Sequence, residues 1–140
     1  MTKQNEKFHY NSALIIDPEI TDLFICSKMF FLKKVAKDVY TRKNINSAIT
    51  LINKMENPVD IIVIDFLSND LIKFLQKFGK LPEKQTKNIK VFILSALLEY
   101  YPGVINEALR FKNVVMTMDK PMSEENMKTI ISLKDNVRLA

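Results

Sequence analysis

The sequence predicts an α/β protein built on a parallel β-sheet, and two features of the chain carry this prediction. Short, continuous apolar runs recur along the 140 residues, and segments of helical periodicity separate them. A continuous apolar run indicates a strand buried on both faces, which is typical of parallel sheets covered by helices. Repeated strand–helix alternation in a chain of this length favours a single doubly wound domain.

Five strand–helix units account for most of the chain. The strands are expected at residues 13–17, 39–41, 59–65, 91–95 and 114–118, the second being a weak strand within residues 37–42. Helices are expected at 20–35, 46–57, 69–79 and 101–112, and a last helix follows Ser123, which is a good N-cap residue. Right-handed crossovers then favour the flavodoxin-like strand order 2-1-3-4-5.

The first helix is expected to turn one apolar face toward the sheet. Ile20, Leu23, Phe24, Ser27 and Phe31 recur at helical spacing and are predicted to form that face. The stretch from residue 80 to residue 88 is polar and is expected to be a connection without regular structure.

Composition limits the classes of function. The formal net charge is +5, but the 21 basic residues are spread from Lys3 to Arg138 without an aromatic-rich cluster, so a nucleic-acid interface is not expected. No apolar run is long enough to cross a membrane, and a cytoplasmic protein is expected. A single cysteine excludes an internal disulfide. His9, the single histidine, lies in the predicted polar leader, so neither a Ser/His/Asp triad nor a His/Cys metal cluster is expected.

The expected organisation is one domain between two short polar ends. Residues 1–11 are predicted to be a polar leader, residues 12–136 the domain, and residues 137–140 a tail. Because the chain ends seven residues after Leu133, we expect no output module after the domain.

Four polar residues fall at the predicted carboxyl ends of the strands, where doubly wound sheets bind their ligands. Asp17 ends the first strand, Asp65 the third and Ser95 the fourth, and Lys120 follows the fifth. This set suits phosphoryl transfer to a carboxylate: an aspartate can act as the nucleophile, while Mg²⁺ and a lysine neutralise the phosphoryl oxygens. Asp17 and Asp65 can supply oxygen ligands to Mg²⁺, and Ser95 can donate a hydrogen bond to the new phosphoryl group.

Each of these residues also has a purely structural interpretation. Asp17, Pro18 and Glu19 together make a good helix start. Asp65 and Ser95 can cap turns, and Lys120 can be a solvated lysine before a turn. The residues alone leave both interpretations open.

Taken together, the motifs resemble the receiver domains of two-component response regulators, from about Ala13 to Leu133. The residues that carry the resemblance are Leu14-Ile15-Ile16-Asp17, Val59-Asp60-Ile61-Ile62-Val63-Ile64-Asp65, Phe92-Ile93-Leu94-Ser95-Ala96 and Lys120-Pro121. The phrases Leu81-Pro82-Glu83 and Lys120-Pro121-Met122-Ser123-Glu124-Glu125 are similar to stand-alone receivers of Bacteroidetes-type bacteria.

The resemblance implies a role for each site residue. Asp65 would be the phosphoacceptor, Asp17 a Mg²⁺ ligand and Ser95 the switch hydroxyl. Lys120 would sense the phosphoryl group, with a cis bond before Pro121. The resemblance also implies that the backbone carbonyl of Leu67 contributes to the metal site.

The chain departs from the family pattern at three positions near this site. Pro18 stands where a second acid usually follows Asp17, so Mg²⁺ binding should be weaker unless Glu19 substitutes. The segment after Asp65 is about two residues shorter than usual. Thr117 replaces the aromatic switch residue three positions before Lys120, so the usual coupling of the hydroxyl to a swinging ring cannot operate in the same way.

By resemblance, the expected function is signalling rather than enzymatic turnover, beyond self-phosphorylation and slow autodephosphorylation. The partners would be a sensor histidine kinase or phosphotransfer protein and a downstream protein that docks on residues 99–133, approximately. The alternative is a degenerate receiver that acts as a phosphorylation-independent adaptor.

Overall fold

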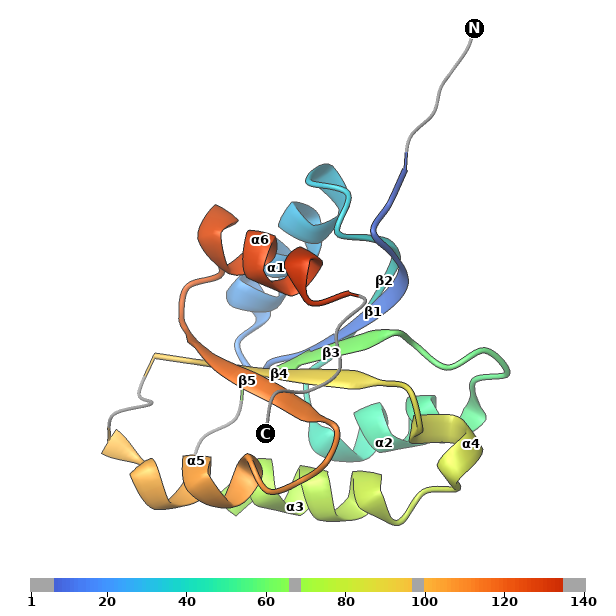
Figure 1. Cartoon of the computed structure of the whole chain (residues 1–140), viewed down its shortest axis with the longest axis vertical. Helices are drawn as coiled ribbons and strands as arrows, with labels where there is room; N and C mark the ends of the chain where they lie inside the picture. Colours follow the sequence, from blue (N-terminus) through green and yellow to red (C-terminus); the bar gives the residue numbers. More distant parts are fainter. Residues whose placement is uncertain (1–6, 66–68, 97–99, 135–140) are drawn as a thin grey trace, which may run out of the picture.

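The fold is known from a computed structural model, and it is described here for residues 7–65, 69–96 and 100–134. In these residues, five parallel strands form one sheet with the order β2-β1-β3-β4-β5, which confirms the predicted topology (Figure 1). The strands are β1 (Tyr10–Ile16), β2 (Ala36–Arg42), β3 (Ile61–Ile64), β4 (Lys90–Ser95) and β5 (Val114–Asp119). The helices are α1 (Ile20–Leu32), α2 (Ile45–Lys54), α3 (Asn69–Gly79), α4 (Glu83–Thr86), α5 (Pro102–Ala108) and α6 (Glu124–Ser132).

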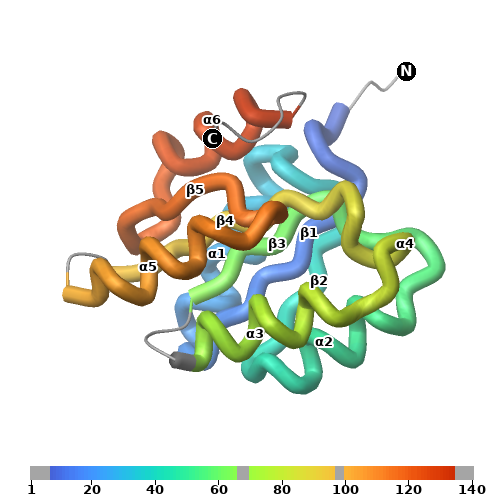
Figure 2. Tube along the Cα trace, turned by 60° about the horizontal axis from the view of Figure 1, so that its bottom comes forward, coloured from blue at the N-terminus to red at the C-terminus, as the bar shows by residue number. Residues whose placement is uncertain are grey.

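Helices cover both faces of the sheet, as the unbroken apolar strands predicted. Helices α1 and α6 lie on one face, and α2, α3, α4 and α5 lie on the other (Figure 1). Figure 2 shows α3 between α2 and α5 on the second face. Each face has its own core, because alternate residues of a strand point to opposite sides. Ile15 and Val63 belong to the core under α1 and α6, whereas Ile16 and Ile64 belong to the core under α2, α3 and α5.

Strand β1 begins earlier than the sequence indicated. Tyr10 and Asn11, which were expected in the leader, are part of the strand. Tyr10 is buried, and its hydroxyl donates a 2.7 Å hydrogen bond to the carbonyl of Ile130 in α6. The first strand is therefore tied to the last helix at this point.

The predicted inward face of α1 is wrong in part. Leu23 is buried as expected, but Cys26 and Phe30 complete the buried face. Ile20 and Phe24 are 60% and 62% exposed, and Ser27 is half-buried and Phe31 exposed. Because apolar residues occur nearly all around this helix, periodicity could not identify the side that packs on the sheet.

A Schellman motif ends α1. The backbone N–H of Lys34 donates to the carbonyl of Phe31 at 3.0 Å, and that of Val35 donates to the carbonyl of Phe30 at 2.8 Å. Lys34 takes the left-handed conformation that the motif requires, with φ of 59°. The buried side chains of Val35 and Phe30 belong to the same core. This contact fixes the rotation of α1 about its axis.

The polar connection after α3 holds the short helix α4, which the sequence did not predict. Its buried residue Gln85 donates side-chain hydrogen bonds to the carbonyls of Ile52 and Met55, at 2.8 and 3.0 Å. Asn113 donates to the carbonyls of Thr86 and Ile89 at 2.8 and 2.9 Å. Side-chain amides thus satisfy carbonyls at the end of α2 and in the connection.

The predicted cap of the last helix is confirmed. The Ser123 hydroxyl accepts a 3.0 Å hydrogen bond from the backbone N–H of Asn126 at the start of α6. Within the described residues, no helix is both long enough and apolar enough to cross a membrane.

Candidate functional site

The carboxyl edge of the sheet brings together the ends of β1, β3, β4 and β5. The backbone N–H of Asp65 donates to the carbonyl of Ile16 at 2.8 Å, so the residue after β3 lies beside the end of β1. The N–H of Lys120 donates to the carbonyl of Ser95 at 3.2 Å, which joins the end of β5 to the end of β4. The main chain therefore holds all four predicted site residues at one edge.

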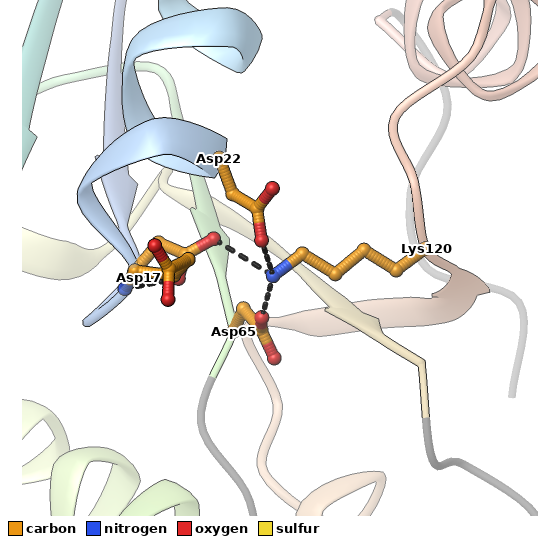
Figure 3. Close-up of polar contacts among 5 residues, drawn as sticks. Asp17, Asp22, Asp65 and Lys120 are labelled. Atoms are coloured by element: carbon orange, nitrogen blue, oxygen red, sulfur yellow. Dashed lines mark hydrogen bonds and ion pairs between the residues drawn. The ribbon is translucent and has the colours of Figure 1, made fainter.

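The Lys120 ammonium is the centre of the site (Figure 3). Its Nζ lies 3.0 Å from Oδ2 of Asp17 and 2.8 Å from Oδ2 of Asp22, and it also donates to Oδ2 of Asp65. The side chains of Asp17, Asp65 and Lys120 are only 5%, 14% and 14% exposed, whereas that of Asp22 is 42% exposed. One ammonium thus meets three carboxylates, one for each of its N–H bonds.

Burial and the pairing between Lys120 and its carboxylates have opposite effects on the pKa values of Asp65 and Lys120. Burial raises the pKa of Asp65, the Lys120 ammonium partly offsets this rise, and the nearby Asp17 and Asp22 carboxylates add to it. Burial alone would lower the pKa of Lys120, but hydrogen bonds to Asp22, Asp65 and Asp17 outweigh burial and raise it. Lys120 is therefore charged at neutral pH, and Asp65 is held in a site that disfavours its ionised form.

Asp22 is the site residue that the sequence analysis missed. It lies in the first turn of α1, five positions after Asp17. An acid in a first helical turn is commonly explained by the helix dipole alone. The position of Asp22 in the sequence could have indicated its role. The first turn of α1 lies beside the end of β1, so side chains of that turn can reach the carboxyl edge of the sheet.

The sequence left open whether Glu19 substitutes for the acid missing at position 18. In the structure the Glu19 side chain is exposed, and it is Asp22 that pairs with Lys120. Glu19 instead takes the N-cap position of α1, and its backbone N–H donates a 2.8 Å hydrogen bond to Oδ1 of Asp17. This bond holds the carboxylate oxygen of Asp17 that does not contact Lys120. The peptide bond between Lys120 and Pro121 is cis, as the resemblance implied.

The two positions to which the resemblance assigned a switch role lie on β4 and β5. Ser95, the last residue of β4, is 3% exposed. Thr117 is half-buried in β5. Its neighbours Met116 and Met118 pack in the core under α1 and α6, so Thr117 faces the α5 side. Leu67, the expected carbonyl donor, is outside the described residues.

A small cavity of about 70 Å³ adjoins the cluster. Besides Asp17, Asp22, Asp65 and Lys120, it is lined by Ile15, Ile16, Ile25, Cys26, Val63, Leu94, Pro121 and Met122. The Cys26 thiol is buried, and burial raises its pKa to about 12, so it is an inert wall rather than a nucleophile. The cavity can hold a few water molecules but not a nucleotide or flavin.

The donor set of the site suits a hard divalent cation, because carboxylate oxygens are the ligands that Mg²⁺ prefers. Among the described residues, no three His, Cys, Asp or Glu side chains are grouped closely enough to hold a metal ion. Mg²⁺ commonly takes only one or two carboxylates and keeps several waters, so two carboxylates such as those of Asp17 and Asp65 could hold it.

The chain shares its fold with response regulator receiver domains of known structure. A response regulator receiver protein from Dyadobacter fermentans matches with a TM-score of 0.76 at 21% identity, covering 88% of this chain and 96% of that one. A two-component response regulator from Cytophaga hutchinsonii matches with a TM-score of 0.77 at 18% identity, covering 94% and 99%. A chemotaxis response regulator from Vibrio cholerae matches with a TM-score of 0.71 at 16% identity, covering 89% and 98%.

No protein-family model matches the sequence, and no curated protein matches it either. The similarity therefore lies in the fold, and the function has to be argued from the site.

Proposed function

We propose that the chain is a receiver that accepts a phosphoryl group on Asp65 and acts by docking to other proteins. The main support is the convergence of the Asp17 and Asp65 carboxylates on the Lys120 ammonium, at the ligand-binding edge of a sheet with the receiver strand order. An aspartate beside a fixed ammonium is suited to attack phosphorus, because the ammonium offsets the charge of the phosphoryl oxygens.

In the proposed step, a carboxylate oxygen of Asp65 attacks the phosphorus of a phosphohistidine on a sensor histidine kinase or phosphotransfer protein. The new P–O bond forms as the P–N bond breaks, and the imidazole nitrogen keeps the electron pair and takes up a proton from water. Lys120 then pairs with a phosphoryl oxygen, and Ser95 donates a hydrogen bond to another.

Asp17 and Asp65 would hold Mg²⁺ in this step. When bound, the ion would neutralise negative charge on the transferring phosphoryl group. Three carboxylates and one ammonium leave the cluster with a net charge of −2, which a divalent cation would balance.

We propose that the phosphodonor docks on the exposed apolar side of α1. Ile20, Phe24 and Ile25 are 60%, 62% and 48% exposed, and Ile25 also lines the cavity beside Asp65. A protein that covers these side chains would therefore reach the phosphoacceptor. Phe24→Asp should abolish labelling by any protein donor that labels the wild type, yet leave labelling by acetyl phosphate unchanged.

For the output side, we propose docking through residues 99–133, which include α5, β5 and α6. Within this segment, Tyr100 is 69% exposed, and Arg110, Lys112, Glu124 and Lys128 add charges of both signs. An exposed aromatic residue beside mixed charge suits a protein partner.

The test is the intact mass of the protein after incubation with acetyl phosphate, with and without Mg²⁺. The wild type should gain one phosphoryl group only with Mg²⁺, and Asp65→Asn should gain none. Asp70→Asn is the matched control, because it removes an exposed acid in the first turn of α3 and should leave labelling unchanged. Labelling of Asp65→Asn, or none of the wild type, would refute the proposal.

One observation favours the alternative, an adaptor that works without phosphorylation. The Lys120 ammonium already has three carboxylate partners, so the charged site is complete without a phosphoryl group. An adaptor of this kind would show no labelling of the wild type, and its partner would bind Asp65→Asn and wild type equally.

A further inference from the structure

Asp22 differs from the other carboxylates of the cluster in where it comes from and how exposed it is. Asp17 and Asp65 end two neighbouring strands and are 5% and 14% exposed, whereas Asp22 comes from α1 and is 42% exposed. Figure 3 shows that it approaches Lys120 from the helix side, away from the strand ends.

The path of the chain explains how α1 supplies this acid. Pro18 and Glu19 lead directly from β1 into α1, and the N–H of Glu19 donates to the Asp17 carboxylate. The first turn of the helix therefore stands over the end of β1. Asp22, the third residue of that helix, reaches the ammonium that the strand-end carboxylates also bind.

We propose that Asp22 is a positioning residue that holds one N–H of the Lys120 ammonium and releases it when a phosphoryl group forms on Asp65. This inference rests on the function proposed above. Phosphorylation turns the Asp65 carboxylate into an acyl phosphate, so the N–H that Asp65 held passes to the new group, and a further phosphoryl oxygen can gain a bond only if Asp17 or Asp22 loses its own. Asp22 is the partner released, because it is the more exposed of the two and water can rehydrate it at the lower cost, while Asp17 is buried.

Asp22 thus competes with the phosphoryl group for Lys120. Removing it should strengthen binding of a phosphoryl analogue by about two- to fivefold, which is the size expected for one half-exposed ion pair. Glu19→Ala is the matched control, since it removes one acid from the same end of α1 without touching Lys120. Asp22→Glu should restore the wild-type behaviour.

The resting contact can be tested without any phosphodonor. In protein carrying ¹⁵N-labelled lysine, the exchange of the Lys120 ammonium protons with water is measured by NMR. Asp22→Ala should accelerate this exchange several-fold, and Glu19→Ala should leave it unchanged. Equal exchange in Asp22→Ala and wild type would overturn the proposal.

The release is tested with beryllofluoride as the phosphoryl analogue, at Mg²⁺ concentrations high enough that binding no longer depends on them. Asp22→Ala should bind the analogue more tightly than Glu19→Ala, and this difference should vanish in a Lys120→Met background, because the effect acts through the ammonium. Lys120→Gln replaces Lys120→Met if the latter does not fold.

Two results would overturn the release: no gain in Asp22→Ala over Glu19→Ala, or the same gain without Lys120. If the wild type binds no analogue and acetyl phosphate does not label it, the proposed function fails and the release fails with it. The proton-exchange result still decides whether Asp22 positions Lys120.

Discussion

The two halves of the candidate site differ in how completely they are built. The charged half, at the ends of β1, β3 and β5, joins three carboxylates to one ammonium through ion pairs from four segments of the chain. The other half, which we call the switch half after its proposed role, lies on β4 and β5. It offers a buried serine and a half-buried threonine, where the receiver pattern that the sequence resembles has a hydroxyl and an aromatic ring. Under the proposed function, phosphoryl transfer would depend on the charged half and the transmission of a signal on the other half, so the two can be tested separately.

The largest expected effect comes from removing the cation of the charged half. Lys120→Met leaves the carboxylates of Asp17, Asp22 and Asp65 without their shared counter-ion, and we expect it to lower the free energy of unfolding by about 3 kcal/mol. Lys73→Met, at an exposed position on α3, should change it by less than about 0.5 kcal/mol. Urea denaturation measures both, and equal small losses would mean that the cluster is not a structural unit.

Removing the carboxylate of Asp65, whose side chain is 14% exposed, should instead raise the free energy of unfolding at neutral pH. Because the folded-state pKa of Asp65 is raised above 3.8, its contribution to stability is present below that pH and is lost as the pH rises through the folded-state value. Asp65→Asn should therefore stabilise the protein at pH 7, by about 1 kcal/mol. The gain should disappear as the pH falls to 3.8. A loss of stability at pH 7 in thermal unfolding would contradict this assignment.

The switch half can be tested separately from the charged half. Ser95→Ala should still be labelled on Asp65 by acetyl phosphate, at a cost of about 1 kcal/mol in stability for the lost buried hydroxyl. It should, however, lose the phosphorylation-induced NMR shifts of backbone amides in α5. Loss of labelling itself would place Ser95 in the charged half of the site.

The smallest expected effect is on the free energy of unfolding, from a substitution at Lys34 just after the C-terminal end of α1. Lys34 has φ of 59°, a conformation that glycine adopts without steric cost. Lys34→Gly should stabilise the protein by about 0.5–1 kcal/mol in thermal unfolding and leave labelling unchanged. A destabilised variant would mean that the lysine side chain outweighs the backbone cost.

The sequence predicted the sheet well because its strands are nearly pure apolar runs. Residues 61–64 are all fully buried, and the acid after them could be assigned to the carboxyl edge by the rule for parallel sheets. The strand order followed from strand–helix alternation and the handedness of crossovers. The apolar runs and the strand–helix alternation are local patterns, so they can be recognised in a single sequence.

What escaped prediction depended on orientation in three dimensions. The apolar residues of α1 occur almost all around the helix, so the side that faces the sheet is fixed by the Schellman motif and the contact of Phe30 with the core, not by periodicity. The same rotation brings Asp22, rather than Glu19, to Lys120. Helix α4 was missed because its stabilising contact, from Gln85 to the end of α2, joins residues more than 30 positions apart.

The most direct test of the central claim locates the modified residue itself. After incubation with acetyl phosphate and Mg²⁺, borohydride reduction converts an aspartyl phosphate to homoserine, and peptide mass spectrometry identifies the position. Our account predicts homoserine at position 65 in the wild type and at no position in Asp65→Asn. Conversion at another aspartate, or none in the wild type under conditions that label a known receiver, would contradict it.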